Sequence, residues 1–551
     1  MCRSAVPMTG GKAIAETLIA NGVTTLFGLP GAQTYPLFDA LAQRRDIIRT
    51  VSARHEQGSA YMAFGAAKST GKPHVYSVVP GAGVLNTTAA LSTAYATSTP
   101  VLCVTGQVPR AFLGRGRGHL HEIPDQLGLL KTLTKWSARI ERVEDAPEIV
   151  NEAFRQMLTG RPGPVAVEMS WDTMAETAPI TLIDGVSPPV PAAADAAEIA
   201  AALAVITAAR RPMIMVGGGA QHAAAAILAL AERLDAPVAA FRGGRGIVAE
   251  THPLGLSSAA AHALWPETDV VIGIGSRLEM PTMRWTGMMG YFDRLPGGRK
   301  LVRIDIDPAE MVRLLADAPV VADARVATEA LVAALGPKTA TDEAARARIA
   351  AAKASLAAAI VRVQPEIGYL EVIRAALPDD GFFVPELCQA GFTSYFGFDV
   401  RTPRTYVTEG YQGTLGFGFP TALGVKAIHP ERAVVSVTGD GGFMFAMPEL
   451  ATAVREGIGL VTVVFDNHAY GNVRRDQQRL YDGRVIASEL TNPDFARLAE
   501  VMGADGYRAD SPAALAPVLA KALAANRPAV IHVDVGVDRE ASPWEFIHFP
   551  P

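Results

Sequence analysis

Two residues that follow short apolar runs, Asp440 and Asn467, have the side chains that a small hard cation prefers. Asp440 lies in a Gly-Asp-Gly-Gly turn directly after the run 433–438 (AVVSVT), and Asn467 follows the run 460–465 (LVTVVF). Both runs are short, apolar and rich in β-branched residues, which is typical of buried parallel strands. Magnesium takes about six oxygen ligands, of which only one or two come from carboxylates. The pattern therefore predicts a site for a magnesium ion that carries a diphosphate.

The segment between the two runs explains why these side chains should meet. Residues 447–454 (MPELATAV) have helical spacing, so the unit is strand, helix, strand, and its two strands must be parallel and close together. Asp440 and Asn467 then emerge at the carboxyl edge of the sheet, where open α/β sheets bind ligands. The alternative, an ordinary Asp-Gly turn after a strand, does not account for Asn467 at the end of the next strand.

The predicted ligand set leaves room for a diphosphate. The Asp440 carboxylate, the Asn467 amide oxygen and the main-chain carbonyl assigned to Ala469 occupy three positions, and two diphosphate oxygens and a water fill the others. Glycines allow the backbone to approach closely, and a following helix offers unpaired N–H groups to phosphates. The diphosphate-binding set is predicted to comprise Asp440, Gly441, Gly442, Asn467, Ala469, Tyr470 and Gly471.

Alternating helical patterns and apolar runs indicate the elements that position this site. Helical patterns at 13–20, 60–67 and 91–95 alternate with strand-like runs at 25–28, 74–79 and 101–105, which predicts a doubly wound parallel sheet. A Pro-rich segment at 178–195 and an Ala-rich helix at 339–360 are typical of connectors. The middle part has candidate strands at 213–216, 270–274 and 301–306. We expect an α/β protein of three doubly wound domains, 1–180, 190–338 and 365–551.

Composition excludes several classes of function. The 551 residues are 49% hydrophobic and 19% charged, with a net charge of -5, so the chain has sizeable cores and no basic surface for nucleic acid or membranes. No run of about eighteen apolar residues occurs, and residues 1–11 have no apolar signal core. Cys2, Cys103 and Cys388 lack the spacing of a metal or redox site. We expect a cytoplasmic protein without nucleic-acid or membrane partners.

Motifs along nearly the whole chain resemble those of the thiamine diphosphate-dependent enzymes related to acetolactate (acetohydroxyacid) synthase. That family has a Gly-Asp-Gly signature followed some twenty-odd residues later by Asn, and here Asp440 and Asn467 are 27 positions apart. Further motifs occur in the family's order. They are 27–32 (FGLPGA), 54–58 (RHEQG), 81–83 (GAG), 105–110 (TGQVPR), 304–308 (IDIDP) and 413–418 (GTLGFG).

The resemblance assigns roles to three residues outside the diphosphate site. By itself Glu56 is a first-turn glutamate favoured by the helix dipole, but the family's Arg-His-Glu-Gln-Gly motif implies that it hydrogen-bonds the pyrimidine N1′ of the cofactor. A carboxyl there exchanges a proton with the pyrimidine, and burial would raise its pKa. Gly413, in a glycine-rich loop, is expected to accept a hydrogen bond from the 4′-amino group. Leu415, where the family often has Met, is expected to support the bent cofactor.

The resemblance also implies a reaction and an assembly. The expected enzyme breaks or forms a C–C bond beside the carbonyl of a 2-oxo acid or 2-hydroxy ketone, as an acetolactate synthase-like carboligase or lyase. A non-ligating 2-oxo acid decarboxylase, C–C hydrolase or aldehyde lyase is the alternative, and a flavin- or nucleotide-binding protein without thiamine chemistry is a third. Because the family builds each site from two chains, we expect a homodimer or homotetramer with shared sites.

Departures from the family leave the substrate open. Where acetolactate synthases have Phe-Gln-Glu, this chain has His121 before a glutamate, with His119 two residues earlier. An imidazole in the pocket would shuttle protons near neutral pH, although lone histidines in a loop are more often structural or exposed. Gln33 is a second candidate, and Arg475 would hold a substrate carboxylate if it faced the pocket rather than the surface.

Flavin binding in the middle part is also left open. The clusters at 217–219 and 273–275 contain glycines, but Leu278 stands where a dinucleotide fingerprint needs its third glycine. Structural glycines at strand-to-helix turns are the favoured explanation of both clusters.

Overall fold

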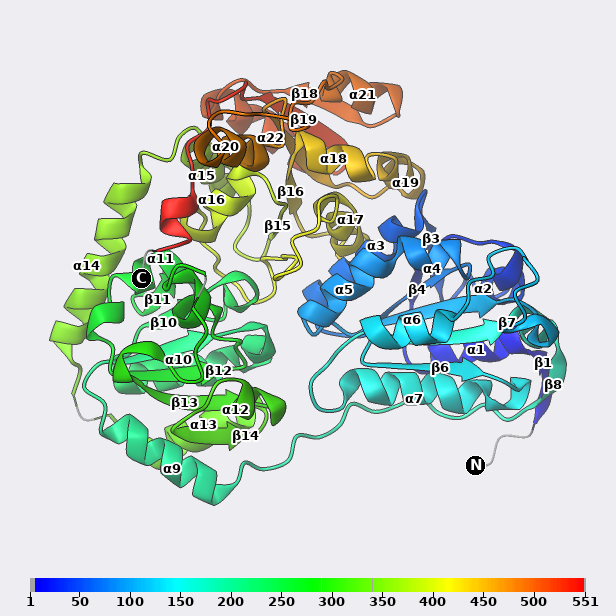
Figure 1. The fold of residues 1–551 in the computed structure, drawn as a ribbon, viewed down its shortest axis with the longest axis horizontal. Helices are drawn as coiled ribbons and strands as arrows, with labels where there is room; N and C mark the ends of the chain where they lie inside the picture. Colours follow the sequence, from blue (N-terminus) through cyan, green and yellow to red (C-terminus); the bar gives the residue numbers. More distant parts are fainter. Residues whose placement is uncertain (1–4, 289, 339, 550–551) are drawn as a thin grey trace.

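The computed structural model describes residues 5–288, 290–338 and 340–549 and shows three α/β domains, each built on a parallel sheet (Figure 1). This confirms the predicted fold class. The three sheets lie inside the three predicted domain ranges, whose ends stay predictions. Among the helices of these residues, none is long and apolar enough to span a membrane.

The first domain has six parallel strands in the order β3-β2-β4-β5-β7-β6. One face of the sheet packs on α1, α2 and α7, and α3 and α5 cover the other, so the sheet is doubly wound. The strands are β2 (Thr25–Gly28), β3 (Arg49–Ser52), β4 (His74–Val78), β5 (Val101–Gln107), β6 (Trp136–Ile140) and β7 (Val165–Ser170). The helices are α1 (Gly10–Ala20), α2 (Tyr35–Ala42), α3 (Glu56–Thr70), α4 (Ala82–Asn86), α5 (Thr88–Ala96), α6 (Gln126–Leu133), α7 (Ala146–Leu158) and α8 (Trp171–Ala175).

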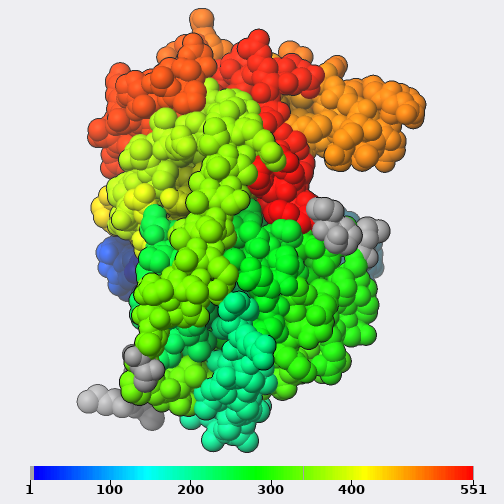
Figure 2. Space-filling view, turned by 90° about the vertical axis from the view of Figure 1, so that its left-hand side faces the viewer, coloured from blue at the N-terminus to red at the C-terminus, as the bar shows by residue number. Residues whose placement is uncertain are grey.

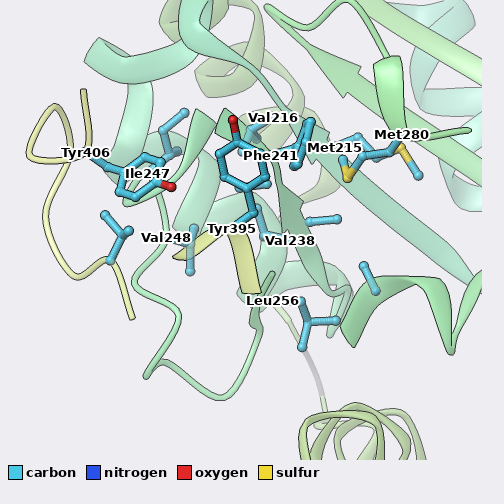
Figure 3. Close-up of a cluster of buried hydrophobic side chains, with 14 of the residues drawn as sticks. Met215, Val216, Val238, Phe241, Ile247, Val248, Leu256, Met280, Tyr395 and Tyr406 are labelled. Carbon is cyan, nitrogen blue, oxygen red and sulfur yellow. The ribbon is translucent and has the colours of Figure 1, made fainter. Parts of the chain in front are cut away.

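The middle domain has six parallel strands in the order β11-β10-β9-β12-β13-β14. Its core continues into the third domain, because Tyr395 and Tyr406 pack beside Phe241 and Ile247 (Figure 3). The strands are β9 (Pro212–Val216), β10 (Val238–Ala240), β11 (Gly255–Ser257), β12 (Val270–Ile274), β13 (Lys300–Asp305) and β14 (Ala318–Val321). The helices are α9 (Ala196–Thr207), α10 (Ala224–Leu234), α11 (Ser258–His262), α12 (Ala309–Arg313) and α13 (Ala324–Leu335).

The third domain has five parallel strands in the order β15-β16-β17-β19-β18, and a parallel bridge from Phe383 to Tyr406 adds a short segment beside β15. Counted with that segment, its strand order equals that of the first domain. The strands are β15 (Phe382–Pro385), β16 (Val434–Gly439), β17 (Val461–Asp466), β18 (Asp505–Arg508) and β19 (Ala529–Asp534). The helices are α15 (Glu366–Ala376), α16 (Gln389–Gly397), α17 (Gly418–Ile428), α18 (Asp440–Ala446), α19 (Glu449–Glu456), α20 (Gly471–Leu480), α21 (Phe495–Val501) and α22 (Pro512–Ala525).

The connectors differ partly from the prediction. Residues 177–180 of the predicted first linker form β8 (Thr177–Ile180), which pairs antiparallel with β1 (Val6–Thr9) because Ala178 and Ile180 are buried. The rest of that linker, 181–195, has no regular structure. The second connector is α14 (Glu343–Ile360), which crosses the surface from the middle domain to the third (Figure 2).

The first and third domains pack through equivalent helices, α3 and α17, which share one core. A Cβ on Gly65 would lie 2.1 Å from the Thr421 carbonyl oxygen, and a Cβ on Gly424 would lie 1.9 Å from the Met62 carbonyl oxygen. The glycines thus let the two backbones touch.

Candidate active site

Glu56 is the first residue of α3 and lies at the carboxyl edge of the first sheet. The side chain of His55 caps the helix by accepting from the N–H of Gln57 at 3.1 Å. The Glu56 carboxylate accepts from Nδ2 of Asn86, in α4, at 2.9 Å, and the side chain is half-buried. The turn between β4 and α4 lies against it, since a Cβ on Gly83 would come within 3.6 Å of Glu56 Cγ. Residues of α4 therefore hold this carboxylate.

Gln33 and His121 meet at the same edge. Gln33 Oε1 lies 3.0 Å from His121 Nδ1, and Gln33 Nε2 donates to the Leu120 carbonyl oxygen at 2.9 Å. A Cβ on Gly81, whose φ is +56°, would lie 2.1 Å from the His121 carbonyl oxygen. The β4–α4 turn that touches Glu56 at one end therefore touches His121 at the other.

His119 has different surroundings. Its ring centroid lies 3.9 Å from that of Phe112, and its N–H donates to the Glu122 carboxylate at 3.0 Å. No hydrogen bond among the described residues joins the His119 ring to Gln33 or Glu56. Of the two predicted histidines, the structure thus brings His121 to the edge that carries Glu56.

Asp440 and Asn467 share the carboxyl edge of the third sheet. Asp440 begins α18 after β16, and Asn467 follows β17, its neighbour in the sheet. Asn492 Nδ2 donates both to Asp440 Oδ2 at 2.7 Å and to Asp466 Oδ1 at 2.8 Å. Burial, together with the charge of Asp466, raises the pKa of Asp440 above its ordinary value. A cation at this edge would offset the cost of placing two carboxylates side by side.

The Asn467 amide has a defined orientation. Its Oδ1 accepts from the N–H of Ala469 at 3.1 Å, and its Nδ2 donates to the carboxylate of Glu540. The amide oxygen therefore lies on the side of Ala469, which is buried. Glu540 belongs to the C-terminal segment, far from any motif, and sequence reasoning did not find it.

Small residues shape the loops around this edge. A Cβ on Gly471, the first residue of α20, would lie 2.4 Å from Asn467 Nδ2, and one on Gly441 would lie 2.6 Å from the Tyr470 ring. A Cβ on Gly442 would lie 2.4 Å from a Glu386 oxygen. The Tyr470 N–H donates to the Ser488 carbonyl oxygen at 2.8 Å. Glycine is thus required where these loops approach one another.

The donor set fits a hard cation. One carboxylate, one amide oxygen and a main-chain carbonyl are the ligand types that Mg²⁺ accepts, with water and phosphate oxygens completing the shell. Within 5–288, 290–338 and 340–549, no cluster of three or more His, Cys, Asp or Glu side chains suits a metal. That finding does not contradict the predicted Mg²⁺ ligands, because only one of them, Asp440, is a carboxylate.

A cavity of about 210 Å³ adjoins the loop of Asn467 and Ala469. Arg475 lines it and donates to Gln389 Oε1 at 3.1 Å, Asn472 Oδ1 at 3.3 Å and the Glu540 carbonyl oxygen at 3.2 Å. Arg475 therefore faces the cavity, and a role in substrate binding stays a prediction. The lining residues are Asn467, Ala469, Gly471, Arg474, Arg475, Gln478, Val537, Asp538 and Glu540.

The loop with Gly413 and Leu415 is anchored at both ends. Gly413 has φ +62°, a conformation that favours glycine, and it is exposed, whereas Leu415 is half-buried. The N–H groups of Gly416 and Gly418 donate to Glu386, a buried carboxyl whose pKa burial raises to about 7. At the other end, Tyr395 Oη donates to Glu409 at 3.2 Å. These anchors come from distant segments and gave no local signal in the sequence.

Within one chain the predicted residues form two groups. No hydrogen bond between described residues joins the edge of Glu56 to that of Asp440. The third domain touches the first at the back of the β3–α3 turn, where Glu449 accepts from the N–H of Arg54 at 3.0 Å and of His55 at 2.9 Å. The Glu56 side chain stays partly open to a further partner.

In the middle domain, the glycines of the candidate nucleotide loops pack on one another. A Cβ on Gly217 would lie 2.3 Å from the Gly275 carbonyl oxygen, and the Gly219 N–H donates to that oxygen at 3.1 Å. These contacts give the glycines a packing role, and flavin binding stays open.

Comparisons with known proteins agree with this layout. Three family models match, described as the N-terminal binding domain (residues 8–129), the central domain (199–331) and the C-terminal binding domain (388–533) of thiamine pyrophosphate enzymes. The chain is 36% identical to a probable 2-ketoarginine decarboxylase of Pseudomonas aeruginosa, over 90% of this chain and 88% of that protein. It is 33% identical to a probable acetolactate synthase large subunit of Methanocaldococcus jannaschii, over 96% and 92%. Identity to the acetolactate synthase isozyme 1 large subunit of Escherichia coli is 28%, over 97% and 95%.

Proposed function

The chain belongs to the thiamine pyrophosphate enzyme family, and from this premise we propose that it uses thiamine diphosphate and Mg²⁺ to remove carbon dioxide from a 2-oxo acid. One observation carries the proposal. The carboxyl edges of two sheets with the same strand order present Glu56 in the first domain, and Asp440 with Asn467 in the third.

The residues divide the work of holding the cofactor. Asp440, Asn467 and the Ala469 carbonyl would hold Mg²⁺, and the loops of Gly441 and Gly471 would receive the diphosphate. When bound, the cofactor supplies a nucleophilic carbon that adds to the 2-oxo acid and retains the electron pair as carbon dioxide leaves.

The pyrimidine end is assigned to the first domain and to one loop of the third. Glu56 would exchange a proton with the pyrimidine, the Gly413 carbonyl would accept from its amino group, and Leu415 would support the bent cofactor.

Each site is proposed to combine the first domain of one copy with the third domain of another. In support, one chain keeps the two groups of residues apart, and large apolar side chains are exposed beside both groups. Leu85, next to Asn86, is 46% exposed, and Phe445, in the helix that Asp440 begins, is 59% exposed. A second copy would cover these side chains and exclude water from Glu56. We therefore propose a homodimer as the smallest active unit.

Two candidate reactions differ in what the former carbonyl carbon of the 2-oxo acid binds after carbon dioxide has left. Protonation would release an aldehyde, as in a decarboxylase such as the relative named for 2-ketoarginine, and addition to a second carbonyl compound would give a ligation product, as in the relatives named acetolactate synthase. His121, at the sheet edge that carries Glu56, supports protonation, and the near full-length similarity to the synthases supports ligation. Removal of carbon dioxide is common to both.

A substrate panel tests the proposal. The protein, with thiamine diphosphate and Mg²⁺, is given pyruvate, branched 2-oxo acids and 2-ketoarginine, each with and without an added aldehyde. Released carbon dioxide is measured, and products are identified by NMR. Aldehyde alone indicates simple decarboxylation, and a hydroxy ketone or hydroxy acid indicates ligation. Bound cofactor with no carbon dioxide released from any 2-oxo acid would contradict the proposal.

A further inference from the structure

We propose that the charged His121 ring is a catalytic acid that delivers a proton from Nε2 to the reacting carbon, and that Gln33 keeps a hydrogen on Nδ1, so that Nε2 is the nitrogen that loses and regains the proton. This inference rests on the proposed function and adds a residue and a role to it. The two side chains come from different loops, about 88 positions apart in the sequence, and meet at the edge that carries Glu56.

The orientation of the Gln33 amide is set by the backbone. The Leu120 carbonyl oxygen accepts only, so the atom 2.9 Å from it must be the Gln33 NH₂ group. The amide oxygen is then the atom 3.0 Å from His121 Nδ1. Gln33 is only 3% exposed, and a Cβ on Gly106 would lie 2.4 Å from the Gln33 main-chain oxygen and 2.8 Å from its Cβ, so Gly106 packs closely against the base of this side chain.

The fixed amide in turn sets the histidine tautomer. An amide oxygen is an acceptor, so His121 Nδ1 must carry a hydrogen in the neutral ring as well as in the charged one. The exchangeable proton therefore belongs to Nε2, which has no hydrogen-bond partner among the described residues. This is the arrangement by which a backbone-anchored acceptor prepares an imidazole for proton transfer at its other nitrogen.

The main chain of His121 supports a functional reading of this contact. Its φ is +66°, in the left-handed region that a non-glycine residue enters at a cost of about 1 kcal/mol or more. The side chain gains its contact with Gln33, and the carbonyl of the same residue packs on Gly81 of the β4–α4 turn. Such a conformation is typical of residues held in place for function.

The proton transfer balances. After carbon dioxide leaves, the reacting carbon would hold an electron pair. The Nε2–H bond of the charged ring then breaks, so that its proton joins that carbon while its electron pair stays on Nε2 and leaves the neutral ring with its hydrogen on Nδ1. Solvent then returns a proton to Nε2. The net reaction consumes one proton for each 2-oxo acid and releases one carbon dioxide and one aldehyde.

The first test reads the tautomer without any turnover. In protein labelled with ¹⁵N in histidine, two-bond ¹H–¹⁵N spectra distinguish Nδ1–H from Nε2–H rings, and the signals missing from His121→Gln identify this residue. We expect an Nδ1–H ring in the wild-type protein and a shift towards Nε2–H in Gln33→Met. An Nε2–H ring in the wild-type protein would overturn the proposal, whatever the substrate is.

The second test measures the fate of the product. His121→Gln is expected to lower aldehyde formation roughly 100-fold, the usual scale of general acid catalysis, while carbon dioxide release in the presence of an acceptor aldehyde falls less than about fivefold. Aldehyde formation in His121→Ala should recover partly with added imidazole. His222→Gln, at an exposed histidine of the middle domain, is the matched control and should stay within about twofold.

A double-mutant cycle separates positioning from mere packing. Gln33→Met is expected to lower aldehyde formation about tenfold in the wild-type background and to have no further effect in His121→Gln, because both changes remove one function. Additive losses would show that Gln33 acts only through the backbone at Leu120, and would reject the positioning role. Equal losses of carbon dioxide release and aldehyde formation in His121→Gln, both measured with the acceptor aldehyde present, would reject the catalytic role while leaving the proposed function intact.

Discussion

The first and third domains have the same strand order but place different chemistry at the same turn. After β4 the first domain has Gly-Ala-Gly at 81–83, and after β16 the third has Gly-Asp-Gly at 439–441. In the first domain the neighbouring turns add Glu56, Gln33 and His121, whereas in the third they add Asn467 and Asp466. We therefore expect the shared edge to fix where a ligand lies and the side chains to decide which end of it is bound.

The largest effect is expected when the third-domain turn is made identical to the first-domain turn. Asp440→Ala gives the third-domain turn the Gly-Ala-Gly sequence of the first. We expect Mg²⁺-dependent binding of thiamine diphosphate to weaken by at least about 100-fold, since even groups that only orient metal ligands change metal affinity about 10–100-fold. Titration calorimetry at several Mg²⁺ concentrations measures this. Asp482→Ala, at an aspartate 85% exposed, is the control, and unchanged binding in Asp440→Ala would remove the third domain from the diphosphate site.

The matching change in the first domain should affect chemistry rather than binding. Glu56→Gln keeps a side chain that can hydrogen-bond the pyrimidine but cannot exchange a proton with it. We expect exchange of the cofactor C2 hydrogen with deuterium to slow by roughly 100-fold or more, with cofactor binding within about threefold. Quenched-flow NMR of the bound cofactor follows the exchange. A wild-type exchange rate would take the catalytic role away from Glu56.

Mixing the two variants tests whether the domains of different chains cooperate. In a shared-site dimer of one Glu56→Gln and one Asp440→Ala chain, one of the two sites keeps both intact residues. If chains reassort randomly, half the dimers are mixed, so about a quarter of wild-type activity should return. Each variant alone, carried through the same dissociation and reassociation, is the control. No recovery despite mixed dimers in native mass spectrometry would indicate that each site lies within one chain.

The contact between the equivalent helices gives a smaller expected effect. Gly424→Ala places a methyl group 1.9 Å from the Met62 carbonyl oxygen, so α3 and α17 must move apart. We expect a loss of about 1–3 kcal/mol in unfolding free energy, the usual cost of overpacking. Chemical denaturation measures the loss. At Gly218 the nearest atom to an added Cβ is 3.7 Å away, so Gly218→Ala should change stability little.

The smallest effect concerns one buried carboxyl in each domain. Glu168, in the first domain, pairs with Arg139 and accepts from Gln126 at 2.7 Å. Glu366, in the third, is 1% exposed, and neither of its oxygens has a hydrogen-bond partner among the described residues. Burial, with Glu540 nearby, raises the pKa of Glu366 to about 8. The folded state therefore binds the extra proton, and stability is lost as pH rises from the ordinary value of 4.5 through about 8.

Substitution by glutamine should separate the two carboxyls. Glu366→Gln should lose less thermal stability between pH 5 and pH 9 than the wild-type protein, by on the order of 2 °C in unfolding midpoint. Glu168→Gln, which removes the buried charge that pairs with Arg139, should instead lower the midpoint at both pH values. Identical pH profiles for the wild-type protein and Glu366→Gln would show that Glu366 is not the titrating group.

The sequence predicted the strands of the site well because buried parallel strands have a local signature. The run 433–438 corresponds to β16 (Val434–Gly439), and the run 460–465 to β17 (Val461–Asp466). The antiparallel β1–β8 pair was missed, because its strands lie 171 positions apart at their starts and only their pairing buries Ala178 and Ile180. Local pattern does not reveal pairing of that range.

By itself, the sequence determined the family, the three-domain α/β class and the residue types at each turn, since these depend on periodicity and on motifs of a few consecutive residues. Tertiary structure alone decided which side chains meet. It joined Gln33 to His121, Asn492 to Asp440 and Glu540 to Asn467, and placed Arg475 at a cavity. The physical reason is that a hydrogen bond depends on distance in space, and the carboxyl edge of a parallel sheet gathers turns that lie far apart along the chain.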